Sequence, residues 1–201
     1  ASEPDYFIVD CNGKPGGTMY LSATGDPHTF NAAVSVSTSN INGWIYSSLL
    51  FPDKYQMPTR PYLAKEWWFS EDGLTLHMKI RQGLKWSDGE PFTLEDVRWT
   101  FEELFPEVTG TGIGGIFDAN GLPPVVKIVD QETISFTWTT PNALATRAIG
   151  FSDIFPKHAL DERLKAGTFE QAWGLDEWDR LVTMGQYTIE DYITGERIVL
   201  K

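Results

Sequence analysis

Few residues of this chain have the types and spacing that chemistry requires, and a glycine-rich run is the first of them. Residues 110–115 match the G-x-G-x-x-G pattern. In dinucleotide-binding proteins this pattern follows a strand and opens a helix, so that backbone N–H groups meet a pyrophosphate. Here a helical pattern precedes the run and a proline-rich segment follows it. We therefore interpret residues 110–115 as part of a surface loop and expect no cofactor.

Metal ligands and catalytic acids are also poorly supported by the residue spacing. The three histidines are scattered, with no H-x-x-x-H pair and no cysteine cluster, so the sequence predicts no metal site. Neighbouring acids such as Glu102–Glu103 and Asp161–Glu162 could in principle provide the two carboxylates of a glycoside hydrolase. Adjacent residues of a helix point in different directions, so we interpret these acids as solvated surface. No G-x-S-x-G nucleophile motif occurs, and we expect no catalytic residues.

Eight tryptophans keep a carbohydrate-acting enzyme open as the rival to a non-enzymatic binding protein. Exposed indole faces can stack on sugar rings, whereas buried ones supply a large apolar area to a core. We expect most of these tryptophans, including Trp67 or Trp68, Trp86 and Trp99, to pack in the core or in hairpins. The aromatic residues are therefore interpreted mainly as structural.

Composition and charge exclude further classes. The formal net charge of -12 and the pI near 4.6 argue against a surface for nucleic acid or anionic lipid. No apolar run approaches the roughly 20 residues of a membrane span. A single cysteine, Cys11, excludes an internal disulfide framework. Attachment as a lipoprotein through Cys11 stays an alternative, although Asp10 stands where a small residue is expected.

The elements that would position a site are clearest between Leu63 and Leu104. Apolar residues alternate with polar ones from residue 74 to residue 80, which predicts a half-buried strand. Turn-forming residues bracket this strand at 70–73 and at 87–89, so we expect a hairpin that leads into a second turn.

A capped helix is expected directly after that second turn. Thr93 offers an N-cap hydroxyl, and Asp96 places a carboxylate three residues later, as in a capping box. The apolar residues that follow at helical spacing until Pro106 are Leu94, Val97, Phe101 and Leu104. The apolar pattern therefore changes here from the period of a strand to that of a helix.

Shorter elements are expected on both sides of this stretch. A first strand is predicted at 18–23, and a helix capped by Thr38 or Ser39 is predicted to run to Leu49. A long loop is expected at 107–124. Further predictions are hairpins at 125–139 and 187–201, a helix opening at Pro156 and a short helix at 169–173.

The order of these motifs resembles the family 5 extracellular solute-binding proteins, the oligopeptide and dipeptide receptors of bacterial ABC importers. The matching runs are LAKEW (63–67), SEDGLT (70–75) and IRQGLKWSDGEPFTLEDV (80–97). Additional matches are DPH (26–28), PNA (141–143) and FPKHAL (155–160). Residues 181–187 resemble the family's return to its large lobe, although Met184 and Gln186 depart from the usual Gly-x-Gly-Pro-Tyr pattern.

This resemblance implies an α+β (mixed α/β) fold of the type II periplasmic-binding-protein class, with a small lobe and part of a large lobe. Residues 1–16 would form a flexible arm and 17–50 the first segment of the large lobe. Residues 51–181 would form the small lobe, and 182–201 a truncated return to the large lobe. The chain is then expected to be an N-terminal fragment without the facing half of the ligand cleft.

The resemblance also implies a periplasmic or extracellular receptor, not an enzyme, that captures oligopeptides or dipeptides and delivers them to an ABC permease. Some members of the family carry oligosaccharides or nickel complexes, which remain alternatives. By position, the expected ligand contacts are Asn31 and Ala33 after the first strand, and Thr111 and Ile113 after Pro106. No nucleic-acid partner is expected, whereas the truncated sheet edge could pair with a second copy.

Overall fold

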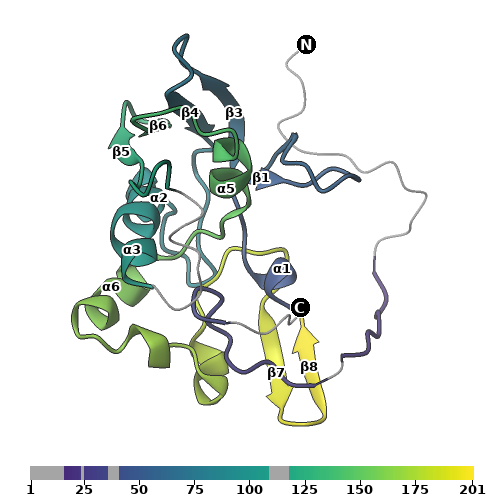
Figure 1. Cartoon of the computed structure of the whole chain (residues 1–201). Coiled ribbons are helices and arrows are strands. Elements are labelled where there is room, and N and C mark those ends of the chain that lie inside the picture. Colours follow the sequence, from purple (N-terminus) through teal and green to yellow (C-terminus); the bar gives the residue numbers. More distant parts are fainter. Residues whose placement is uncertain (1–15, 24, 36–40, 109–117) are drawn as a thin grey trace.

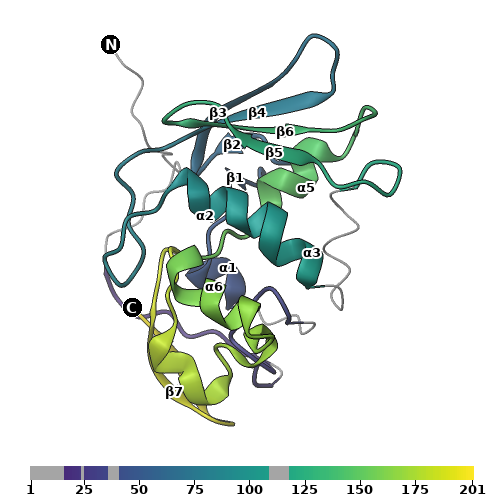
Figure 2. The same cartoon turned by 90° about the vertical axis from the view of Figure 1, so that its left-hand side faces the viewer.

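The structure is a computed structural model, and it describes residues 16–23, 25–35, 41–108 and 118–201. Figures 1 and 2 show a sheet and its covering helices at the upper end of the molecule. A C-terminal hairpin lies at the lower end, made of β7 (Ile189–Ile193) and β8 (Arg197–Leu200). The predicted α+β class is confirmed by this mixture of helices and antiparallel sheets.

The main sheet is antiparallel, with the strand order β3-β4-β6-β5. Its members are β3 (Ala64–Phe69), β4 (Thr75–Ile80), β5 (Val125–Ile128) and β6 (Thr133–Thr137). The strand predicted at 74–80 and the hairpin predicted at 125–139 are therefore confirmed. Along β4 the buried positions are Leu76, Met78 and Ile80, so the alternation in the sequence marks the face that meets the core.

The turn between β3 and β4 forms as its residue types predict. The Asp72 carboxylate accepts hydrogen bonds from the Ser70 hydroxyl at 2.6 Å and from the Leu74 N–H at 3.0 Å. Gly73 has a φ of +70°, a conformation that glycine adopts without strain. These contacts set the register of the hairpin that the rest of the sheet extends.

A helical rod runs beneath the sheet in Figure 2. It consists of α2 (Leu94–Trp99), the π-helical segment η1 (Thr100–Leu104) and α3 (Phe105–Glu107). The predicted capping box is present, because the Asp96 carboxylate accepts the Thr93 N–H at 2.8 Å. The π-helical turn lies just before Pro106, where the missing N–H and the bulky ring require a change in the α-helical hydrogen-bond pattern.

Several other helices lie between the rod and the C-terminal hairpin or against the sheet. They are α5 (Ala145–Phe151), α6 (Lys157–Lys165) and the 3-10 helices η3 (Phe169–Gln171) and η4 (Leu175–Arg180). Pro156 directly precedes the first residue of α6, as predicted, where its missing N–H leaves no helix bond unmade. Asp96 accepts the N–H of Lys157 at 3.0 Å and so ties α6 to α2.

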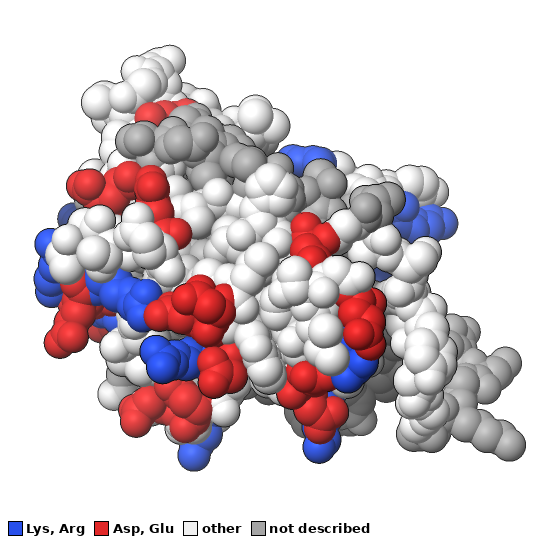
Figure 3. Space-filling view, turned by 90° about the horizontal axis from the view of Figure 1, so that it is seen from below, with Lys and Arg blue, Asp and Glu red and all other residues white. Residues whose placement is uncertain are grey.

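The lower face of the molecule carries mixed charge. Figure 3 shows acidic side chains interspersed with basic ones on this face, without a continuous basic patch. Ion pairs of α6, η4 and the C-terminal hairpin include Arg163 with Glu177 at 2.7 Å and Lys201 with Glu190 at 2.9 Å. Exposed pairs of this kind contribute little to stability, roughly 0–1 kcal/mol each, so the fold depends on its apolar core.

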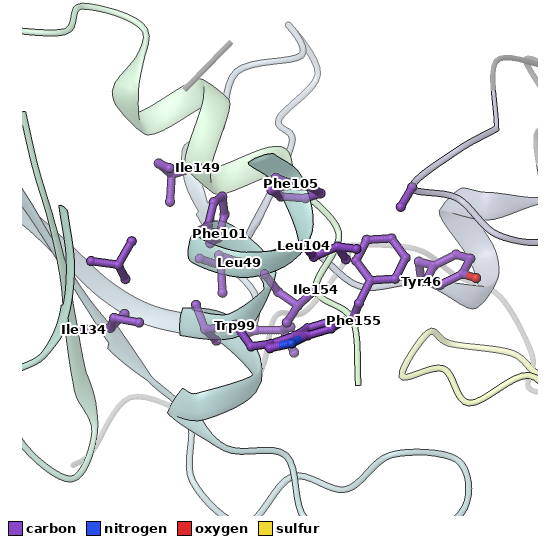
Figure 4. Packing of buried hydrophobic residues seen from close by; sticks show 14 of the residues in the cluster. Tyr46, Leu49, Trp99, Phe101, Leu104, Phe105, Ile134, Ile149, Ile154 and Phe155 are labelled. Carbon is purple, nitrogen blue, oxygen red and sulfur yellow. The ribbon is translucent and has the colours of Figure 1, made fainter. Parts of the chain in front are cut away.

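The core is formed where the rod packs on the sheet. The rings of Phe101 and Phe136 meet edge to face with centroids 5.0 Å apart. Trp99 is completely buried, and its indole N–H donates to Asp161 at 3.0 Å. Figure 4 shows the labelled core side chains lying together. They come from the rod, from Ile134 of β6, from Ile149 of α5 and from the segments that contain Tyr46, Leu49, Ile154 and Phe155. Segments far apart in the sequence therefore share one apolar cluster.

Two predictions for the N-terminal part need correction. Residues 18–23 form no strand, and Tyr20 is 90% exposed. Alternating side chains specify a strand only where another strand accepts its backbone hydrogen bonds, and none of the described strands pairs with this segment.

The helix predicted to reach Leu49 is also shorter than expected. It is α1 (Asn42–Ile45), whereas Thr38 and Ser39 lie outside the described residues. After α1 the chain extends into β1 (Leu50–Phe51), which pairs with β2 (Arg60–Pro61). Leu49 is fully buried in the extended chain, so its helical spacing was misleading.

The hairpin β7–β8 confirms the hairpin predicted at 187–201. The segment before this hairpin runs alongside α1. Gly185 donates its N–H to the Ile45 carbonyl at 2.8 Å, and Tyr187 donates to the Trp44 carbonyl at 3.0 Å. A Cβ at position 185 would lie 2.2 Å from the carbonyl carbon of Ile45. Glycine is therefore required at this crossing for a steric reason.

Candidate ligand-binding site

A pocket of about 420 Å³ lies between the loop at 31–33 and the segment that contains α5 and the chain leading to α6. This volume falls within the range of ligand sites. Its lining is mainly apolar, from Ala32, Ala33, Phe105, Leu144, Ala148, Phe151 and Phe155. The polar members of the lining are Arg147, Ser152 and Asp153. Residues distant in the sequence thus form one concave surface.

The loop at 31–33, which forms one wall of the pocket, is fixed by hydrogen bonds to the segment at 169–173. Asn31 is fully buried, and its side-chain N–H₂ donates to the Phe169 carbonyl at 3.1 Å. Its side-chain oxygen accepts the N–H of Ala33 at 3.1 Å. Phe30 donates its N–H to the Trp173 carbonyl at 3.0 Å. These bonds fix the backbone that presents Ala33 to the pocket.

The predicted contact residues therefore take different places. Ala33 lines the pocket, whereas the Asn31 side chain bonds to the backbone and positions the loop. Thr111 and Ile113 lie outside the described residues, as does the glycine-rich run 110–115. Contact of any of these residues with a ligand stays a prediction.

Tyr46 supports the same wall from the interior. Its hydroxyl donates to the Phe30 carbonyl at 2.7 Å, and its ring lies 5.4 Å from that of Phe155. Burial raises the pKa of Tyr46 far above its ordinary value, so the hydroxyl stays protonated and keeps donating. The loop wall and the opposite wall are thereby joined through one buried side chain.

Asp153 is one of several pocket residues that the sequence analysis missed. Its backbone forms an isolated antiparallel bridge with Ser48, and the next N–H, of Ile154, donates to the Ser47 carbonyl at 3.1 Å. Within the part of the chain that the structure describes, no donor contacts its carboxylate. Desolvation raises the pKa of Asp153 to about 7. A single acid inside the apolar run F-S-D-I-F was the available sequence signal.

Arg147 also lines the pocket, but its guanidinium group contacts groups other than Asp153. Its guanidinium donates to the Gln56 carbonyl at 3.2 Å and lies 5.6 Å from the centre of the Phe151 ring. A guanidinium paired with Asp153 would lower the pKa of that carboxyl group, whereas the pKa is raised. Among the described residues, the pocket therefore combines apolar walls with one carboxylate that has no paired cation.

The acids considered for catalysis are used in surface ion pairs. Glu102 and Glu103 both contact Arg98, at 2.7 and 3.2 Å. Asp161 accepts from Trp99 and pairs with Lys165 at 2.5 Å. The interpretation of these acids as surface side chains fits this arrangement.

The histidines and tryptophans also have structural surroundings. His158 lies 2.8 Å from Asp88, and His77 stacks on Trp68 at a centroid distance of 5.3 Å. Trp86 and Trp99 are buried, in agreement with their predicted packing. Across the described residues, no group of three or more His, Cys, Asp or Glu side chains could hold a metal ion.

Comparison with known proteins places this fold in a class. The model of the bacterial extracellular solute-binding proteins, family 5, middle part, matches residues 59–201. The dipeptide-binding protein of Escherichia coli strain K12 is 31% identical over 207 residues, which cover 92% of this chain and 37% of that protein.

Solved structures share the same architecture. The ABC transporter substrate-binding protein CtaP of Listeria monocytogenes has a TM-score of 0.72 and 28% identity, covering 89% of this chain and 35% of that one. The periplasmic binding protein MelB from Agrobacterium fabrum C58, in complex with stachyose, has a TM-score of 0.69 and 24% identity, with coverages of 88% and 29%. The predicted type II periplasmic-binding-protein fold is thus confirmed.

The chain belongs to family 5 of the bacterial extracellular solute-binding proteins. Members of this family are transport binding proteins. The chain spans about a third of the length of the curated relatives that it matches first. None of the helices in the described ranges has the length and apolarity that crossing a lipid bilayer demands.

Proposed function

We propose that this chain contributes one part of the substrate-binding component of an ABC importer. The protein captures oligopeptides or dipeptides in a cleft between lobes and delivers them to a membrane permease. The observation that supports this most is the 31% identity to a dipeptide-binding protein over 92% of the chain. The pocket beside Ala33 and α5 is the part of the cleft wall that this chain supplies.

The proposed lobe division accounts for the position of this pocket. Residues 17–50 and 182–201 belong to the large lobe, and residues 51–181 form the small lobe. Ala32 and Ala33 then line the pocket from the large lobe, whereas the other lining residues come from the small lobe. A ligand that touches both sides favours the closed arrangement of two lobes joined by a hinge.

The protein expressed from its complete open reading frame tests this proposal. Its melting temperature is measured with and without mixtures of dipeptides and longer peptides. A bound ligand should raise the melting temperature, because it stabilises only the folded state. Analysis of the mixture after incubation should show the peptides unchanged. Steady release of cleavage products would support an enzyme and contradict the receptor.

An oligosaccharide is the second candidate ligand, because a protein of this fold has been solved with stachyose. The same melting experiment with sugars in place of peptides separates the two candidates. A nickel complex, as expected for some family members, is tested by adding nickel with histidine as chelator. Stabilisation by one class and not by the others identifies the ligand.

The remaining expectations concern location and self-association. We place the protein in the periplasm or outside the cell, and a lipid anchor at Cys11 is a further prediction. The sheet β7–β8 has two strands, so its outer backbone groups are available for pairing with a second copy. Light scattering of residues 1–201 should show dimers that the protein from the complete reading frame lacks. Equal monomeric masses would contradict this.

A further inference from the structure

The backbone of Trp173 adopts a conformation that is rare for a large side chain. Its φ is +57°, and the residue is only 4% exposed. Among the described residues, Gln56 and Asn120 are the other non-glycine residues with positive φ, and both are exposed. A bulky residue keeps such a conformation only where its surroundings compensate for the strain. The contacts around Trp173 therefore have to hold it in place.

Glu177 holds the N–H side of Trp173. One oxygen of its carboxylate accepts the Trp173 N–H at 2.9 Å, and the other accepts a guanidinium N–H of Arg163 at 2.7 Å. The Arg163 guanidinium holds the pKa of this carboxyl group below its ordinary value, so the group stays charged at neutral pH. The ion pair adds little stability in itself, but a charged acceptor strengthens the hydrogen bond from the backbone N–H.

The carbonyl side of Trp173 holds the loop that forms one wall of the pocket. This carbonyl accepts two hydrogen bonds, from the Phe30 N–H at 3.0 Å and from the Thr29 hydroxyl at 3.0 Å. Ala32 and Ala33, which follow in the same loop, line the pocket. The φ of Trp173 sets the direction of its carbonyl relative to its N–H. A fixed N–H therefore also fixes the place at which the loop is bound.

We propose that Glu177 is a positioning residue of the ligand site, which acts through the backbone of Trp173 on the loop at 29–33. Without its carboxylate, Trp173 relaxes toward negative φ and its carbonyl turns away from Phe30. A ligand then has to order the loop when it binds, and this ordering lowers the affinity. The effect on ligand affinity rests on the proposed function, whereas the effect on the loop does not.

Asp161 provides a matched control for Glu177. Its carboxylate also accepts hydrogen bonds from a cation, Lys165, and from a tryptophan N–H, that of Trp99. Its side chain is 19% exposed, close to the 17% of Glu177. The bond to Trp99 connects α6 with the rod instead of with the loop at 29–33. D161A and E177A thus remove the same kinds of contact from different places.

The first measurement is hydrogen exchange of the Phe30 amide in the protein from the complete reading frame, without ligand. The rate is divided by that of the Met78 amide in β4, which corrects for overall stability. E177A should raise this ratio by about 10-fold, because the loop loses its fixed acceptor, whereas D161A should leave it unchanged. An unchanged ratio in E177A, or an equal rise in D161A, overturns the inference.

The second measurement is the affinity for two peptides, Ala-Phe and Ala-Phe-Ala-Ala, by calorimetry well below the melting temperature. E177A should weaken the binding of the tighter peptide by about 10-fold. E177Q, whose amide oxygen can still accept the Trp173 N–H, and D161A should stay within about threefold of the parent. Equal affinities of the parent and E177A, or a loss in E177Q as large as in E177A, overturn the inference.

Failure of the proposed function is distinguishable from failure of this inference. If neither these peptides nor the peptide mixtures bind the parent, the peptide proposal is wrong, and the exchange of the Phe30 amide in E177A decides the inference alone. If the peptides bind the parent and E177A equally well, Glu177 does not position the site and the receptor proposal stands.

Discussion

The stretch from Leu63 to Leu104 and the pocket beside Asp153 differ in how their polar groups are used. In the stretch, polar side chains serve the fold, as when Asp72 closes the hairpin and Asp96 caps α2. In the pocket, a carboxylate faces apolar walls without a donor among the described residues. The difference teaches that the polar groups of the most recognisable part of the chain contribute to stability, whereas the less regular part contains a carboxylate without a hydrogen-bond donor among the described residues.

The largest expected effect comes from removing Trp99, the fully buried ring of the rod. W99A should lower the free energy of unfolding by about 4 kcal/mol, because it leaves a cavity and removes the hydrogen bond from the indole N–H to Asp161. Denaturant unfolding measures this loss. W68A is the matched control, since Trp68 is 45% exposed and should lose about 1 kcal/mol or less.

The distinction between the stretch from Leu63 to Leu104 and the pocket would be weakened if W99A changed the ligand affinity of the protein molecules that remain folded. We expect that affinity to be unaltered, because Trp99 does not line the pocket. A reduced affinity at a temperature well below the melting point would show that the two regions are not separate in function.

A smaller but still large effect is expected at Gly185. G185A should lower the free energy of unfolding by about 3 kcal/mol, because the new Cβ would lie 2.2 Å from the backbone of Ile45. G43A serves as the control, since a Cβ at position 43 meets no atom within 4 Å. Equal stabilities of the two variants would contradict the close approach.

At Asp153 the expected effect is a gain in stability that depends on pH. The pKa of this group is raised from 3.8 to about 7 in the folded protein. Folding therefore favours the neutral carboxyl group of Asp153. The stability that this preference contributes to the parent protein is fully present below pH 4, and it is lost as the pH rises through 7. D153N should match the parent near pH 4 and be more stable by about 2 kcal/mol at pH 8, with allowance for water in the pocket.

Thermal unfolding at several pH values measures this difference. Burial keeps the neighbouring Tyr46 protonated over this range, so its ionisation does not contribute. D179N, which removes a charge at an exposed position, is the control for the loss of charge alone. A gain for D153N that is the same at pH 4 and pH 8 would mean that Asp153 does not change its charge between them.

The smallest effect is expected for the ion pairs of the sheet. Glu132 contacts Lys65 at 2.8 Å and Lys79 at 2.9 Å, and these partners hold its pKa below the ordinary value. All three side chains are about one-third exposed. E132Q should therefore lower the stability only slightly at low salt, and still less at 0.5 M NaCl. Chemical denaturation at both salt concentrations measures this, and a loss as large as that of G185A would contradict it.

Local chemistry explains which parts of the fold were predictable. The alternation around Met78, the capping box at Thr93 and the proline before α6 each act through neighbours within a few residues. The segment at 18–23 and the helix after Ser39 were predicted less well. Their final structure depends on partners far along the chain, and a local pattern does not contain those partners.

The pocket was predictable only in part for the same reason. Ala33 was found through the resemblance of its loop, whereas Asp153 has an ordinary neighbourhood in the sequence. Its special character arises only when the chain brings Ser48, Phe105 and the loop at 31–33 around it. Desolvation of a charge is a property of the folded molecule, and one acid between apolar residues indicates it weakly.

A crystal structure of the protein from its complete reading frame, grown with the tightest-binding peptide, tests the central claim most directly. The account predicts that the ligand lies in the pocket beside α5, in contact with Ala33 and Phe155. A ligand bound against the stretch 63–104 instead, away from this pocket, would contradict it.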